Sequence, residues 1–128
     1  MESISLARQI DIVFRQISNE LLYLSSGTVF IQIRNNIVGK FGVRHLPIEG
    51  RDGKMEVHRK GLSDSQVSSF RKIAIDALNY KSWTHGEILI DFTMRQNLLC
   101  TSVQLESNYN FAAMLPNQRG IQDTNAII

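Results

Sequence analysis

The sequence predicts an α+β domain in which an antiparallel sheet of about five strands carries helices on one face. Three features indicate this fold: a hairpin at residues 87–106, an amphipathic helix at 3–24 and a second helix that begins at Ser63. The expected order is α-β-β-β-α-β-β, followed by a short C-terminal helix. A chain of 128 residues suits one domain, which we expect at 1–116, with 117–128 as a flexible tail.

The first helix is predicted by apolar residues that recur at three- and four-residue steps, namely Leu6, Ile10, Val13, Phe14, Ile17, Leu21 and Leu24. Ser3 is expected to cap its start, and Gly27 to end it in a left-handed conformation. Three further apolar residues, Ile4, Ile12 and Leu22, fall outside this stripe. They indicate either unusually wide burial or contact with another chain.

Two extended segments, Thr28–Arg34 and Ile37–His45, flank Asn35-Asn36, a pair that tolerates a tight turn. A two-residue loop would place Ile31 opposite Lys40. A three-residue loop that includes Arg34 places Ile33 opposite Ile37 and Val29 opposite Phe41, and it keeps one face apolar. We therefore favour the longer loop. The turn signal Asp52-Gly53 then leads to a third strand at Met55–Arg59.

The second helix has a capping box formed by Ser63 and Gln66. Its expected buried stripe runs to about Tyr80 and consists of Val67, Phe70, Ile73, Ala74 and Ala77. Residues 107–115 can form a short helix or a segment that covers the body, and Pro116 ends it.

The hairpin at 87–106 determines its own register through a two-residue turn at Gln96-Asn97. The predicted cross-strand pairs are Met94 with Leu99, Phe92 with Thr101, Ile90 with Val103 and Ile88 with Leu105. One face is therefore almost wholly apolar and must be covered. The order of elements is similar to that of the small dimeric chaperones of bacterial type III secretion, which implies a protein-binding role. Those chaperones are usually acidic, and this chain is not.

The net charge of +2 is small, but its distribution is uneven. Residues 34–81 hold ten Lys or Arg against five Asp or Glu. On the sheet face opposite the helices, the basic residues could form a positive plate that binds an anion or nucleic acid. The candidate residues are Arg34, Lys40, Arg44, Lys54, His58, Arg59 and Lys60.

Catalytic and metal-binding patterns are sparse. The sequence holds neither a G-x-S-x-G elbow nor a phosphate-binding glycine loop. A metal site would have to combine His45 and His58 with Glu56 or Cys100, and we expect neither a metal nor a cofactor. His85 with Glu87 or Asp91 could do acid–base work. The alternative is that Trp83 fills the edge of the core and His85 is exposed.

The residues therefore favour a non-enzymatic protein-binding module that acts as an adaptor, chaperone or regulator, as a homodimer in the cytoplasm. Ile4, Ile12 and Leu22 are its candidate interface. The single cysteine, Cys100, excludes an intrachain disulfide, and no apolar run could span a membrane. A nucleic-acid-binding regulator that uses the basic plate is the first alternative. A small enzyme with a pocket at His85 or Cys100 is the second.

Overall fold

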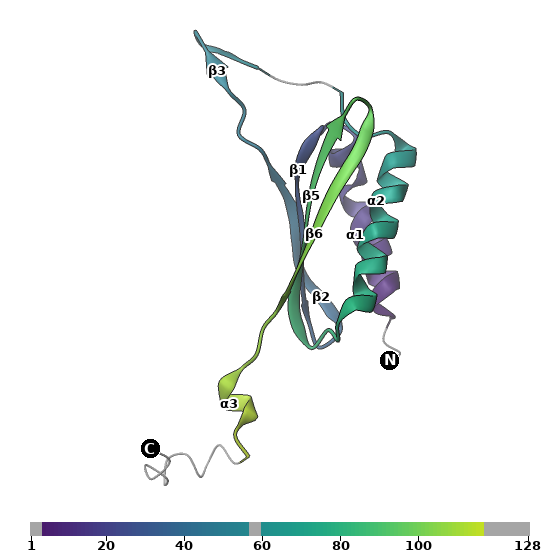
Figure 1. The fold of residues 1–128 in the computed structure, drawn as a ribbon, viewed down its shortest axis with the longest axis vertical. Coiled ribbons are helices and arrows are strands. Elements are labelled where there is room, and N and C mark those ends of the chain that lie inside the picture. Colours follow the sequence, from purple (N-terminus) through teal and green to yellow (C-terminus); the bar gives the residue numbers. More distant parts are fainter. Residues whose placement is uncertain (1–3, 57–59, 117–128) are drawn as a thin grey trace.

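The computed structural model describes residues 4–56 and 60–116 and confirms an α+β architecture. Two helices, α1 (Leu6–Leu21) and α2 (Asp64–Ala77), lie on one face of a four-stranded antiparallel sheet (Figure 1). The sheet has the order β2-β1-β5-β6. Its strands are β1 (Ser26–Arg34), β2 (Ile37–His45), β5 (His85–Arg95) and β6 (Leu98–Ser107).

The core lies between the helices and the inner faces of β1 and β5. Phe70 of α2 is fully buried between Phe14 of α1 and Phe92 of β5, with ring centroids 5.3 and 5.2 Å away. The capping box of α2 is confirmed, and a 3₁₀ turn (Leu78–Tyr80) continues the helix. The hairpin register is confirmed at all four predicted pairs. This register places Ile88, Ile90 and Phe92 in the core.

The predicted register of β1 and β2 is wrong. The turn has two residues, Asn35 and Asn36, so Arg34 pairs with Ile37 and Ile33 with Val38. A β-bulge then places Gly39 and Lys40 together opposite Gln32, after which Ile31 pairs with Phe41. The extra residue returns Phe41 and Val43 to the inner face, where both pack against the core.

The described part of the predicted third strand does not join the main sheet. Asp52 and Gly53 do form a turn, but it links two short strands, β3 (Gly50–Arg51) and β4 (Lys54–Met55), in a separate hairpin. This hairpin projects from one end of the body (Figure 1). The segment Met55–Arg59 extends into residues 57–59, which lie outside the described residues.

The predicted caps of the first helix also differ. The helix ends at Leu21, and Gly27 lies inside β1 with φ of 157°. A Cβ atom on Gly27 would lie 2.7 Å from the carbonyl oxygen of Arg44, so glycine permits close strand pairing there. Ser5 caps the helix, since its hydroxyl accepts a hydrogen bond from the backbone N–H of Arg8. Ser3 lies outside the described residues.

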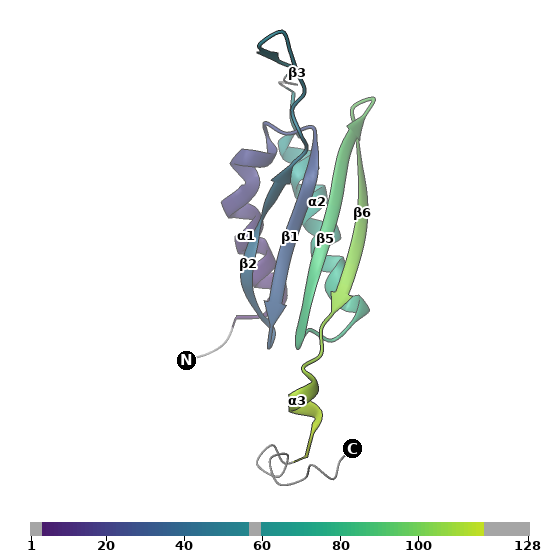
Figure 2. The same cartoon turned by 90° about the vertical axis from the view of Figure 1, so that its left-hand side faces the viewer.

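The other face of the sheet, which we call the outer face, is not covered by the helices (Figure 2). The β1 and β2 half of this face carries Arg34, Lys40 and Arg44, whereas the β5 and β6 half carries Glu87, Asp91, Arg95 and Glu106. Beyond β6 the chain leaves the body and forms the short helix α3 (Phe111–Met114). This segment does not cover the sheet.

Candidate functional site

The possible acid–base residues lie along the outer face of β5. His85 and Glu87 line one open hollow together with Arg34 and Glu106. Asp91 is six residues from His85, which is about 20 Å in a strand. Its carboxylate accepts a hydrogen bond from the hydroxyl of Thr28 at 2.5 Å. The structure therefore brings His85 and Glu87 together and separates both from Asp91.

Trp83 fills the edge of the core, as the alternative interpretation of this segment expected, but His85 is half-buried rather than exposed. It is buried, and its indole N–H donates to the carbonyl of Leu78 at 3.1 Å. The ammonium of Lys81 lies 3.8 Å from the Trp83 ring centroid and donates to the carbonyl of Ser82. Desolvation lowers the pKa of Lys81 below its ordinary value of 10.5. Through these contacts, Lys81 and Trp83 pack the connection between α2 and β5.

Cys100 is exposed on the outer face and lies opposite Thr93 of β5. The hollow beside it is lined by Asp91, Arg95 and other residues, but by no histidine. His85 stands at the opposite end of β5. A thiolate nucleophile needs an adjacent base or cation. Asp91 and Arg95 share the hollow with Cys100, but among the described residues the thiol forms no hydrogen bond or ion pair with either.

Of the predicted pair of histidines, His58 lies outside the described residues. His45 instead contacts Glu20 of α1, with 2.5 Å between its Nε2 and the carboxylate. Glu56 faces Arg51 at 4.0 Å. Across residues 4–56 and 60–116, no group of three or more His, Cys, Asp or Glu side chains could hold a metal ion.

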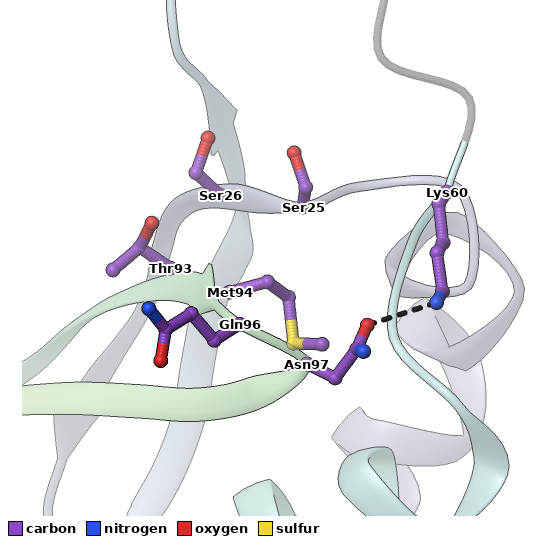
Figure 3. Close-up of a pocket in the computed structure, with 7 residues that line it drawn as sticks. All are labelled: Ser25, Ser26, Lys60, Thr93, Met94, Gln96 and Asn97. Atoms are coloured by element: carbon purple, nitrogen blue, oxygen red, sulfur yellow. Dashed lines mark hydrogen bonds between the residues drawn. The ribbon is translucent and has the colours of Figure 1, made fainter.

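The predicted basic plate is dispersed over the molecule. Arg34 and Arg44 stand near opposite ends of the β1–β2 ladder, and Lys54 belongs to the projecting hairpin. Lys60 lines a hollow at the end of the sheet, where its ammonium donates to the side chain of Asn97 at 2.9 Å (Figure 3). His58 and Arg59 are outside the described residues. Acidic side chains on β5 and β6 share the outer face, so a phosphate backbone laid across it would meet both signs of charge.

The three predicted interface residues at the first helix differ in their exposure to solvent. Ile4 and Ile12 are exposed at 52% and 45%, whereas Leu22 packs partly against the core. Ile4 and Ile12 are eight residues apart, and the exposed Arg8 lies between them on the helix surface. They form no continuous apolar strip with each other.

An apolar groove lies where α2 meets β6, and we call it the α2–β6 groove. Its lining comes from Ile73, Asp76, Ala77, Tyr80, Val103 and Leu105. Tyr80 is 78% exposed and Val103 is 39% exposed, although Val103 points to the helix-covered side of the sheet. The groove therefore presents apolar side chains to solvent directly beside an edge strand.

The free edge of β6 offers backbone groups next to this groove. Arg95 and Leu98 flank a two-residue turn and form the first hydrogen-bonded pair of the hairpin. Hydrogen-bonded and non-hydrogen-bonded pairs alternate along an antiparallel ladder. Every second residue of β6 therefore directs its N–H and C=O away from β5. These residues are Leu99, Thr101, Val103, Leu105 and Ser107, all on the inner face.

The two edges of the sheet are protected to different degrees. β2 contains the bulge and the charged Lys40 and Arg44, and the Gln9 side chain accepts a hydrogen bond from its Val38 N–H at 2.7 Å. Natural sheets use such bulges, charges and covering groups to prevent strand addition. β6 contains no Pro, Lys or Arg, and its one charged residue is Glu106 near the end. β6 is therefore the edge that is open to a further strand.

Comparison with family models, curated proteins and solved structures finds no match to this chain. The similarity in element order to the type III secretion chaperones stays an expectation. No helix of the described residues is long and apolar enough to cross a membrane.

Proposed function

We propose that this chain is a non-enzymatic protein-binding module that takes up an extended segment of a protein by strand addition to β6. One feature carries the proposal: an unprotected edge strand that lies directly beside the apolar α2–β6 groove. In this mode, backbone hydrogen bonds supply affinity, and side-chain pockets beside the strand supply specificity.

The chemistry of the groove agrees with this role. Four of its six lining residues are Ile, Ala, Val and Leu, and Tyr80 adds a large ring with a polar tip. Exposed tyrosine at the rim of an apolar patch is typical of protein interfaces. A single exposed free thiol suits a reducing compartment, so we place the protein in the cytoplasm.

Photo-cross-linking in cells tests the proposal. We replace Tyr80 with benzoylphenylalanine, a ring of similar shape, and compare it with the same replacement at Tyr23 of the α1–β1 connection. The two positions are matched, because Tyr23 is 74% exposed and Tyr80 is 78% exposed. We expect protein adducts at position 80 and few at position 23.

If the partner binds along β6, the adducts at position 80 must also depend on the side chains of β6. A second change, Val103→Lys, places a charged side chain in the groove and should remove the adducts at position 80. Equal adducts at positions 23 and 80, or none at 80, would contradict the proposed function.

A further inference from the structure

We propose that a second copy of this chain occupies the groove, with β6 of each copy paired antiparallel and the two-fold axis at Ser102. This inference rests on the proposed strand addition and names its partner. The two sheets then form one continuous sheet of eight strands. Each copy is both the docking site and the added strand, as an isologous interface requires.

The inner-face side chains select this register. An axis at Ser102 places Leu99 of one copy opposite Leu105 of the other, and Thr101 opposite Val103. Cross-strand pairs of aliphatic and β-branched residues stabilise a sheet. Moving the axis by one residue to Val103 would leave Leu99 opposite the polar Ser107.

The backbone supports the same pairing. The N–H and C=O groups of Thr101 and Val103 point toward the free edge of β6, so these two residues can form a hydrogen-bonded pair across the axis. Ser102 then faces Ser102 of the second copy as a non-hydrogen-bonded pair, with Cα atoms about 4.5 Å apart.

Charge complementarity on the outer face favours a second copy as the occupant. Glu106, the one charged residue of β6, would lie opposite Leu98 of the second copy. In the sheet of each copy, Leu98 pairs with Arg95. Each Glu106 would therefore lie two strands away from Arg95 of the other copy, with only Leu98 between them in the same row, and the pairing brings no like charges directly opposite each other.

Single-cysteine cross-linking tests the pairing without disturbing the core. In a Cys100→Ser background, Ser102→Cys gives each copy a single thiol beside the two-fold axis. The two Cα atoms at position 102 would then be close enough for a disulfide. We expect nearly complete disulfide-linked dimer under mild oxidation. The wild-type Cys100 is the matched control, since it lies on the same strand and face but about 14 Å from its counterpart.

Sedimentation velocity at micromolar concentration supplies the second measurement. Val103→Lys, at a position that is 39% exposed, should weaken the dimer about a hundredfold, because the change enters the two-fold interface twice. Ile12→Lys, at a position that is 45% exposed on α1, should leave the dimer intact. Circular dichroism confirms that both variants fold.

Three outcomes would overturn the inference: a monomeric wild type, cross-linking through Val103→Cys rather than Ser102→Cys, or loss of the dimer with Ile12→Lys alone. A monomer that still forms adducts with another protein at position 80 would leave the proposed function standing. A dimer that cross-links at Ser102 and yields only self-adducts supports both.

Discussion

At the scale of single residues, a bulge in β2 absorbs one extra position, so that apolar side chains on both sides of it reach the core. Val38 and Phe41 are three positions apart, so in a regular strand they would face opposite sides of the sheet. The bulge at Gly39 and Lys40 turns both toward the helices. Lys40 itself supplies no core contact, and the bulge absorbs it as an extra residue of the strand.

Deleting Lys40 should therefore be tolerated. The shortened strand would pair Gln32 with Gly39 and keep Ile33 with Val38 and Ile31 with Phe41, without a bulge. We expect the free energy of unfolding in urea to change by less than about 1 kcal/mol at fixed protein concentration. Deletion of Asp91 from the regular strand β5 is the control. It would turn buried residues outward and cost roughly 4 kcal/mol or more.

At the scale of elements, the start of α2 joins the helix layer to the β5–β6 hairpin. The Ser63 hydroxyl accepts the Gln66 backbone N–H at 3.1 Å, and the Gln66 side chain accepts the Ser63 N–H at 2.9 Å. The same Gln66 side chain donates to the backbone carbonyl of Asn97 in the hairpin turn. Gln66 of the capping box thus ties the start of α2 to the turn that leads into β6.

Ser63→Ala should lower the free energy of unfolding by about 1 kcal/mol, because the Gln66 N–H loses its acceptor. Ser65→Ala in the first turn of the same helix is the matched control. Ser65 is exposed and is not the cap residue, so its removal should change stability by less than about 0.5 kcal/mol. Chemical denaturation measures both, and equal losses would contradict the role of the cap.

At the scale of the whole molecule, the two helices cover the four-stranded sheet unevenly. α1 and α2 bury the inner faces of β1 and β5, and coverage thins at β6, where Val103 reaches solvent. The β3–β4 hairpin and α3 project from opposite ends of the body and add no cover (Figure 1). The folded chain therefore has one weakly covered sheet edge, which is where we place its partner.

Replacing residues 50–55 with a Gly/Ser segment of equal length should leave the sheet and helices intact. The β3–β4 hairpin pairs with itself and not with the main sheet. We expect an unchanged circular dichroism spectrum in the helical region and a loss of no more than about 1 kcal/mol in the free energy of unfolding. A loss several times larger would show that the hairpin supports the body.

Local signals were sufficient for much of the fold. The turn at Gln96-Asn97 and the apolar alternation around it determined the β5–β6 register, and Ser63 with Gln66 marked the start of α2. The bulge was not predictable, because a two-residue and a three-residue loop each satisfy part of the β2 pattern. The contact between His45 and Glu20 joins residues far apart in the sequence, so no local pattern could indicate it.

The sequence alone determined the composition of each face: Val103 and Leu105 had to point with Ile88 and Ile90, since side-chain direction alternates along a strand. Tertiary structure alone decided how far the helices cover that face and which edge of the sheet is protected. Those properties depend on where α1 and α2 lie across four strands, and that position results from packing between residues distant in the sequence. The candidate site consequently lies at β6, and not on the apolar residues of the first helix.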